Sequence, residues 1–328
     1  MSNCNFGVCV PQDGRTFDDI RRLALKCEDL HFSSFWLFDH LHSFPRPDKD
    51  PFVECWVTLS ALAEITREIR LGSLVTSIQY RHPALLAKMA TTIDHISEGR
   101  LEFGIGAGGT GRSEWSQKMG FVAEYDAYGM DFPSKATVRI ERLREAVQII
   151  KRLWVEPRVS FRGKHYRLTD AFSYPKPLQK PHPPVWIGGT GERHLLDVVA
   201  QEADGCNFAW NLSPQEYRRR LDTLGEYCNR FGRSLDSLRK SLLTACVIAK
   251  NADDVSGLLG EVMKPYEQIR GYVPYAFRAS ALTGTIDECI RKVNEFKEAG
   301  VTDFIIVFPE FETERWLTQF AESVMPSF

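Results

Sequence analysis

Eight short apolar runs alternate with longer segments of helical periodicity, and this alternation constrains the fold more than any other feature. The runs predict strands of a parallel sheet that is buried on both faces. They are Phe6–Val10, Ser34–Phe38, Leu71–Thr76, Leu101–Gly106, Val185–Gly188, Gly205–Phe208, Leu242–Ala249 and Phe304–Val307. The predicted helices are Phe17–Leu30, Cys55–Thr66, Leu85–Ile96, Val138–Trp154, Glu192–Glu202, Pro214–Arg230, Asp253–Val262 and Asp287–Ala299. Eight such repeats predict one α/β domain over residues 1–328, a (β/α)8 TIM barrel, with a doubly wound sheet as the alternative.

Length and charge suit a barrel enzyme and argue against several other classes. A chain of 328 residues with 43% hydrophobic and 26% charged residues is normal for a barrel with insertions. The net charge of −2 provides no basic surface for nucleic acid or an anionic membrane, so we expect neither as a partner. No apolar run reaches the roughly 18 residues that cross a bilayer. With no signal peptide and eight scattered cysteines without a C-x-x-C motif, we expect reduced thiols and a cytoplasmic location.

Two connections are much longer than the others. The first, from Gly106 to Val138, contains Gly108-Gly109-Thr110-Gly111, and the second, from Val155 to Pro184, is rich in proline. Long loops of compact domains are usually functional or disordered. We therefore expect both insertions to overhang the C-terminal mouth of the barrel.

The second apolar run ends abruptly in Asp39-His40, where α/β enzymes place their chemistry. Histidine titrates near neutral pH, which suits it to proton transfer. The alternative is that Asp39 caps the next segment and His40 is an ordinary loop histidine. His42 completes a His-x-His pair, but no further ligands close a metal site at the other strand ends, so we expect no metal.

Glycines follow two other predicted strands. Gly188-Gly189-Thr190-Gly191 precedes a helix start, where backbone amides and the helix dipole favour a phosphate; a tight turn is the alternative. The segment from Gly104 to Gly109, which includes Gly106, Ala107 and Gly108, leaves backbone without side chains that could face something flat and large. Together with Asp39-His40, these segments suggest a planar cofactor that carries a phosphate.

Several motifs through most of the chain match one family in order and spacing. They are Trp36-Leu37-Phe38-Asp39-His40, Arg81-His82-Pro83-Ala84, Asp94 to Leu101, Gly104 to Gly108, Tyr128 to Pro133, Tyr174 to Gln179, Pro183 to Gly189 and Ala203-Asp204-Gly205. On these residues the chain resembles the bacterial luciferase-like flavin and deazaflavin oxidoreductases. Within them it is similar to the subgroup that uses coenzyme F420, an 8-hydroxy-5-deazaflavin.

The resemblance implies positions for the cofactor and the catalytic groups. It implies a bulge, often with a cis non-prolyl peptide, near Ser73-Leu74-Val75, and Glu124 matches a downstream acid of the family better than Glu114 does. The catalytic residues it implies are His40, Asp39 and Glu124. The cofactor-binding residues it implies are Asp39, Ser73, Leu74, Val75, Thr76, Gly106, Ala107, Gly108, Gly188, Gly189, Thr190 and Gly191. Basic residues that grip a sugar phosphate in some relatives have no clear match here, and a homodimer is expected.

The leading hypothesis is an oxidoreductase that transfers a hydride between coenzyme F420 and a small organic substrate. His40 would exchange a proton with the substrate, and Asp39 would fix the tautomer of His40 or hold its turn. Basic residues in the insertions (Arg112, Lys118, Lys176 and Lys180) would meet the carboxylates of the F420 tail, or they are solvated loop charges. The alternatives are an FMN-dependent monooxygenase that uses O2 and a flavin-binding protein without catalysis.

Overall fold

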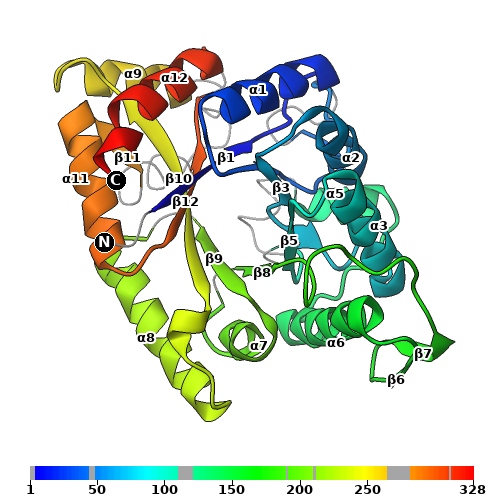
Figure 1. The fold of residues 1–328 in the computed structure, drawn as a ribbon. Coiled ribbons are helices and arrows are strands. Elements are labelled where there is room, and N and C mark those ends of the chain that lie inside the picture. Colours follow the sequence, from blue (N-terminus) through cyan, green and yellow to red (C-terminus); the bar gives the residue numbers. More distant parts are fainter. Residues whose placement is uncertain are drawn as a thin grey trace.

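Eight parallel strands close into a ring in the computed structural model (Figure 1), which confirms the predicted barrel. The structure describes residues 4–43, 49–109, 121–189, 191–209, 212–263, 281–309 and 312–328, with the backbone alone for 121–123 and 263. The ring strands are β1 (Asn5–Val10), β2 (Ser34–Leu37), β3 (Arg70–Ser73), β5 (Leu101–Gly106), β8 (Val185–Gly188), β9 (Gly205–Ala209), β10 (Arg239–Ile248) and β12 (Asp303–Val307). They pair in this order, and β12 pairs with β1 to close the ring.

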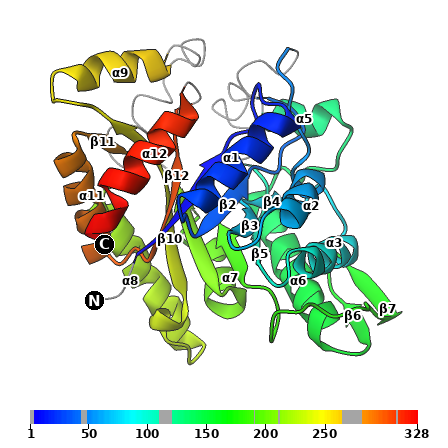
Figure 2. The same ribbon diagram turned by 45° about the horizontal axis from the view of Figure 1, so that its top comes forward.

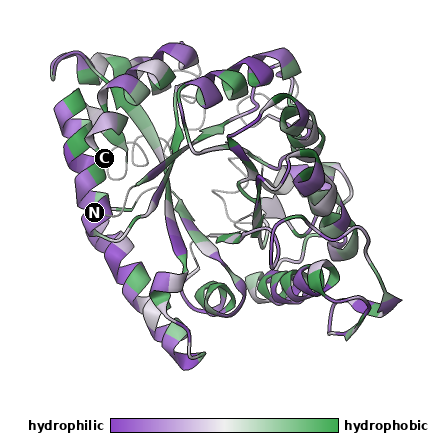
Figure 3. Ribbon diagram, viewed as in Figure 1, coloured by the Kyte–Doolittle hydropathy of each residue, from purple (hydrophilic) through white to green (hydrophobic). Residues whose placement is uncertain are grey.

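Helices surround the ring with their apolar sides inward (Figure 3). They are α1 (Phe17–Asp29), α2 (Cys55–Ile65), α3 (Pro83–Ile96), α5 (Phe121–Ala127), α6 (Ala136–Val155), α7 (His194–Glu202), α8 (Pro214–Arg230), α9 (Asp254–Met263), α11 (Ile286–Glu298) and α12 (Thr313–Ser323). Capping boxes of the Ser/Thr-x-x-Asp/Glu type start α1, α8 and α11, because the cap hydroxyl and the third-residue carboxylate satisfy unpaired backbone amides.

The set of helices differs from the prediction at the C-terminal end of the chain. The predicted helix Asp253–Val262 is α9, an addition that comes before the short strand β11 (Leu282–Gly284), which pairs with β10 beside the ring. The helix that follows the last ring strand is α12, which the sequence analysis missed. The sequence pattern predicted eight helices, and α9 took the place that α12 has among the regular repeats.

Two tryptophans fill the middle of the barrel. Trp36 on β2 and Trp186 on β8 point inward, and their rings meet edge to face with centroids 5.9 Å apart. Space for Trp36 depends on Gly72 of β3, since a Cβ atom there would lie 2.5 Å from the indole ring. The glycine therefore serves packing rather than chain flexibility.

Replacing Gly72 with alanine is expected to lower the free energy of unfolding by about 1–3 kcal/mol, the usual cost of overpacking a filled core. Gly257→Ala in α9 is the matched control, because within the described part of the chain no atom lies within 4 Å of a Cβ there and alanine favours a helix. Urea denaturation of both variants measures the difference. Equal stability of the two variants would show that the side chains around Trp36 can move to admit the extra methyl group without a loss of stability.

A network of charged side chains closes the barrel at the N-terminal ends of its strands. Glu102 on β5 is fully buried and accepts hydrogen bonds from Arg70 Nε, from Arg239 Nη1 at 2.9 Å and from Trp186 Nε1 at 2.5 Å. Arg239 also donates to Asp303 at 2.5 Å. Three strands and the Trp186 ring are therefore tied to one carboxylate.

The proline-rich insertion runs along the outside of α6 and then reaches this same N-terminal end, which corrects the prediction that it overhangs the mouth. It forms the antiparallel hairpin β6 (Val159–Arg162) and β7 (Arg167–Ala171), and then runs back to β8. Gln179 donates to the Leu101 carbonyl and accepts from Arg70, both at strand starts. Figure 2 shows the hairpin near one end of the barrel and α5 near the other. The physical reason is topological, because a connection from a helix to the next strand enters a barrel at its N-terminal face.

Two motif residues hold this insertion. Asp94 of α3 is fully buried and accepts from the Leu178 amide at 2.7 Å and from the Gln179 side chain at 2.7 Å. Lys176 donates to the carbonyls of Leu153 and Glu156 at the end of α6. The rim role predicted for Lys176 and Lys180 is therefore wrong, because both lie in the segment at the N-terminal end. Arg112 and Lys118 lie outside the described residues.

Candidate active site

The third strand breaks where the family resemblance implied a bulge. The predicted strand Leu71–Thr76 divides into β3 and the short β4 (Thr76–Ser77), and the Leu74–Val75 peptide between them is cis. Ser73 donates to the Gly104 carbonyl at 2.9 Å and Thr76 donates to Ser73 at 2.9 Å, so both hydroxyls hold the break. Leu74 joins the barrel interior, and Val75 is directed to the mouth.

The glycines at the mouth make room for Val75. A Cβ atom would lie 2.7 Å from Val75 at Gly106 and 2.8 Å from it at Gly188. Val75 therefore fills the space that side chains would take at these two glycines, and the expectation that this backbone faces a flat ligand stays a prediction. Gly108 has a positive φ of 78° and packs against Ser77 and Tyr125, while Ala107 accepts from Gln79 at 3.1 Å.

An apolar floor lies at the C-terminal ends of the strands. Its members are partly exposed side chains that pack on the interior tryptophan cluster: Phe38, Val75, Ala209 and Val307. They come from β2, the β3–β4 break, β9 and β12, so they surround the mouth. Partly exposed apolar groups in such a ring could hold a flat aromatic system. The sequence analysis missed Phe38, Ala209 and Val307, although their inward positions at strand ends were a usable signal.

Asp39 is held by a bidentate ion pair. Arg81, after β4, donates to its two carboxylate oxygens at 2.7 and 3.0 Å and also to Glu54, which caps α2. Burial lowers the pKa of Arg81, but the neighbouring Asp39 and Glu54 carboxylates outweigh it and raise the pKa above its usual value. Of the two roles that the sequence left open for Asp39, holding the turn fits these contacts.

His40 is paired with Glu124, the acid that resemblance selected 84 residues away. The Nδ1 atom of His40 lies 3.0 Å from Glu124 Oε2. Tyr80 donates its hydroxyl to the same oxygen at 2.6 Å, and the Leu41 amide donates to the other oxygen. The side chain of Glu124 is fully buried, whereas that of His40 is 23% exposed. Residues after β2, after β4 and on α5 therefore meet at one carboxylate.

The charge of Glu124 determines the tautomer of His40. Burial raises the pKa of Glu124, but hydrogen bonds from His40, Tyr80 and Leu41 outweigh it, so the net pKa lies below its usual value. An ionised carboxylate only accepts hydrogen bonds, so Nδ1 of a neutral His40 must carry the proton. The Nε2 atom is then the proton acceptor, as in other histidine bases oriented by a carboxylate.

Further contacts position this cluster. Gln12, fully buried, donates to the Phe38 carbonyl at 2.7 Å and accepts from the Phe38 amide at 3.0 Å, which extends the strand pairing just before Asp39. Tyr125 of α5 donates to Ser77 at 2.7 Å, and burial raises the pKa of Tyr125 to about 12, so it remains a donor. Sequence reasoning missed Gln12 and Tyr80.

The proposed phosphate segment is only partly described. Gly188 ends β8, and Thr190 lies outside the described residues. The Gly189 amide donates to the Asn207 carbonyl at 3.2 Å, so it is engaged by the sheet. Helix α7 begins at His194, two residues later than predicted, and its cap residue makes no side-chain hydrogen bond to the first turn. Amides of the first helical turn that are not capped by a side chain could bind an anion beside Gly191.

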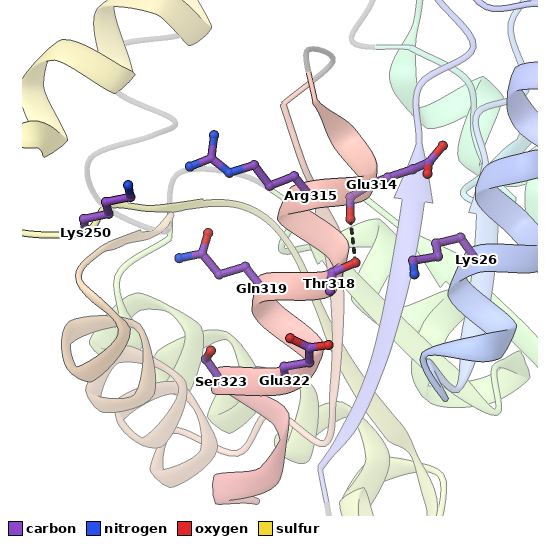
Figure 4. Close-up of a pocket in the computed structure, with 8 residues that line it drawn as sticks. All are labelled: Lys26, Lys250, Glu314, Arg315, Thr318, Gln319, Glu322 and Ser323. Carbon is purple, nitrogen blue, oxygen red and sulfur yellow. Dashed lines mark hydrogen bonds between the residues drawn. The ribbon is translucent and has the colours of Figure 1, made fainter.

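Other kinds of site are less well supported. Within the described residues no three His, Cys, Asp or Glu side chains are placed to hold a metal ion, and none of the helices seen is long and apolar enough for a membrane span. A hollow of about 530 Å³ lies along α12, where Thr318 donates to the Glu314 carbonyl (Figure 4). None of the predicted site residues lines it. All eight cysteines are free thiols.

Comparisons with known proteins identify the family. The F420-dependent glucose-6-phosphate dehydrogenase of Kineococcus radiotolerans is 34% identical over 333 residues, covering 92% of this chain and 90% of the relative. The enzyme of that name from Amycolatopsis mediterranei is 25% identical over 337 residues, covering 94% and 93%. A solved F420-dependent secondary alcohol dehydrogenase, in complex with an F420-acetone adduct, superposes with a TM-score of 0.81 at 19% identity and covers 98% of both chains. The luciferase-like monooxygenase family model matches residues 4–303, and the chain belongs to this family.

Proposed function

We propose that the protein is an F420-dependent oxidoreductase that transfers a hydride between coenzyme F420 and a small organic substrate at the C-terminal mouth. The observation that carries this proposal is the His40–Glu124 pair beside the apolar floor, since it joins a proton-transfer group to a surface for a flat ring. The relatives from Kineococcus radiotolerans and Amycolatopsis mediterranei match over nearly their full lengths, and both are named F420-dependent glucose-6-phosphate dehydrogenase.

The residues at the mouth fit the cofactor. The apolar floor of Phe38, Val75, Ala209 and Val307 would support the ring, and the segment from Gly188 to the start of α7 would bind the phosphate. When bound, F420 supplies a deazaflavin carbon, C5, that accepts or delivers a hydride. The protein contributes binding, orientation and proton transfer.

His40 moves the proton that accompanies the hydride. With Nδ1–H directed at ionised Glu124, Nε2 takes a proton from a substrate hydroxyl or returns one to a carbonyl. Glu124 stabilises the imidazolium that forms, and Arg81 keeps Asp39 and the preceding turn in place. We therefore propose a hydroxyl or carbonyl compound as the substrate.

FMN remains the alternative cofactor, because it shares the ring and the phosphate. An FMN-dependent monooxygenase that uses O2 would need no base at His40 to remove a proton from an alcohol. The F420 names of the near full-length relatives favour the deazaflavin. A binding protein without catalysis is disfavoured, because the fully buried Glu124 orients a histidine, and binding alone would not need that arrangement.

Turnover tests the proposal. Purified protein is mixed with oxidised F420 and, in turn, with secondary alcohols, primary alcohols and glucose 6-phosphate, and the loss of cofactor absorbance is followed with and without O2. We expect at least one compound to reduce F420 at a rate that O2 does not change. Substrate-dependent O2 consumption with reduced FMN, together with no F420 reduction, would contradict the proposal.

We also expect a homodimer in the cytoplasm. The homodimer is implied by family resemblance, and the eight free thiols, seven of them buried, suit a reducing compartment. Light scattering coupled to gel filtration measures the assembly state.

A further inference from the structure

Tyr80 and His40 both contact the carboxylate of Glu124. Its hydroxyl lies 2.6 Å from Glu124 Oε2, the oxygen that also lies 3.0 Å from His40 Nδ1. Two donors therefore share one oxygen of a buried carboxylate. We propose that Tyr80 is a positioning residue that acts on His40 through Glu124, an inference that rests on the proposed function of His40.

The surroundings of the Tyr80 phenol keep its hydroxyl protonated and its ring in a fixed position. Burial raises the pKa of Tyr80 above its usual value, with Tyr125 and Glu124 adding to the rise, so the hydroxyl stays protonated. The Tyr80 ring stacks on Tyr125 with centroids 4.9 Å apart, and the Arg81 guanidinium carbon lies 5.9 Å from the ring centroid. Contacts with Tyr125 and Arg81 therefore hold the side chain that donates to Glu124.

The Tyr80 hydroxyl lowers the basicity of the Glu124 carboxylate. The carboxylate then stabilises a protonated imidazole of His40 less strongly. A hydrogen bond to an ionised group favours the charged form and disperses its charge. Without the Tyr80 hydroxyl, Glu124 would carry its charge with fewer donors and would stabilise a protonated His40 more strongly. The Tyr80 hydroxyl thus weakens the interaction of Glu124 with a protonated His40.

Other ionisable groups surround the pair and must be accounted for. Among the described residues they include Asp39 and His42 on the loop of His40, Arg81 beside Tyr80 with its second partner Glu54, and Tyr125 next to Glu124 on α5. Asp39 and Arg81 are bonded to each other, and Tyr125 donates to Ser77. Changing Tyr80 to Phe keeps the Asp39–Arg81 and Tyr125–Ser77 contacts, but it removes the hydroxyl contact between Tyr80 and Tyr125 together with the hydrogen bond to Glu124.

The test is the NMR titration of the His40 imidazole in protein free of cofactor, using ¹⁵N-labelled histidine. In Tyr80→Phe we expect the titration curve of His40 to move to higher pH by about 0.5–1 unit, as the loss of one charged hydrogen bond allows. In protein with 3-fluorotyrosine at position 80, a stronger donor, the curve should move to lower pH. This second protein also keeps the inference testable if Tyr80→Phe does not fold.

Two further variants separate a positioning role from a structural one. Tyr128→Phe removes a hydroxyl that lies 3.4 Å from the Leu41 carbonyl, so it perturbs the same loop without touching Glu124, and the curve should not move. In a Glu124→Gln background, Tyr80→Phe should add no shift, because the residue between the two is no longer charged. An unchanged curve in Tyr80→Phe, or an equal shift in both backgrounds, would overturn the inference.

Activity provides an independent readout. In the direction where His40 removes a proton, the acid limb of the kcat/KM profile of Tyr80→Phe should move to higher pH, with the plateau reduced by less than about tenfold. If the protein proves not to use F420, the proposed function fails, while the NMR result still decides the role of Tyr80. If F420 turnover is present but the His40 curve does not move in Tyr80→Phe, the further inference alone fails.

Discussion

The variant His40→Ala is expected to lose about 10²–10⁴-fold in kcat while it binds F420 as well as the original protein does, the usual contribution of a positioned acid–base group. The loss arises because His40 supplies the base at this position. Among the described residues, no other side chain places a titrating nitrogen on Glu124 that could replace it. The imidazole meets the cofactor floor at Phe38, where the ring centroids lie 6.3 Å apart, and the other floor residues and the α7 start remain, so the dissociation constant of F420 should stay within about threefold. Steady-state kinetics and fluorescence titration measure the two quantities separately.

His42→Ala is the matched control for this prediction. It removes an imidazole from the same loop, where Nδ1 lies 3.0 Å from the Ser43 carbonyl and the ring stacks on Tyr128. We expect a change of only a few fold in kcat. Equal losses in the two variants would mean that the loop conformation, rather than the His40 proton, limits turnover. Full turnover in His40→Ala would remove His40 from the reaction.

The largest expected effect on stability follows from Glu102→Ala. Removing a buried carboxylate leaves its partners without an acceptor, which typically costs about 3–5 kcal/mol. We expect about 3 kcal/mol, the lower end of that range, because the Arg70 and Arg239 side chains are 31% and 37% exposed and water can reach them. Trp186 also loses the acceptor for its indole N–H. Urea denaturation measures the difference in the free energy of unfolding.

Glu141→Ala provides the comparison on the surface. Glu141 pairs with Lys164 and His165 but is 46% exposed, so solvent and salt screen both contacts and the stability should hardly change. If Glu102→Ala were no more destabilising than Glu141→Ala, the network at the base of the barrel would have no net role in stability.

The barrel could be predicted from sequence because its parallel strands are buried on both faces and therefore appear as continuous apolar runs. The same patterns could not separate a regular helix from an added one, so α9 was counted and α12 was not. The break between β3 and β4 has no signal in the apolar pattern, since Leu71–Thr76 is uninterrupted, and only family resemblance located it. The position of the proline-rich insertion, by contrast, follows from chain direction and could have been predicted.

The candidate site was predictable where a residue type coincides with a strand end, as for Asp39-His40. Its internal pairing was not, because Glu124 lies 84 residues from His40 and nothing local links them. Arg81 belongs to a motif that was recognised, yet its partner Asp39 became visible only in three dimensions. The glycines at the mouth were interpreted as room for a ligand, and sequence could not show that Val75 fills part of that space.

The most direct test of the central claim is the titration of cofactor-free protein with F420 and, separately, with FMN, followed by ring fluorescence. An F420-dependent oxidoreductase should bind F420 about tenfold or more tightly than FMN, equivalent to about 1.4 kcal/mol. Tighter binding of FMN would contradict the account and move the protein to the oxygen-using members of its family. Binding of neither cofactor would mean that the apolar floor and the Gly188–Gly191 segment do not form a flavin site.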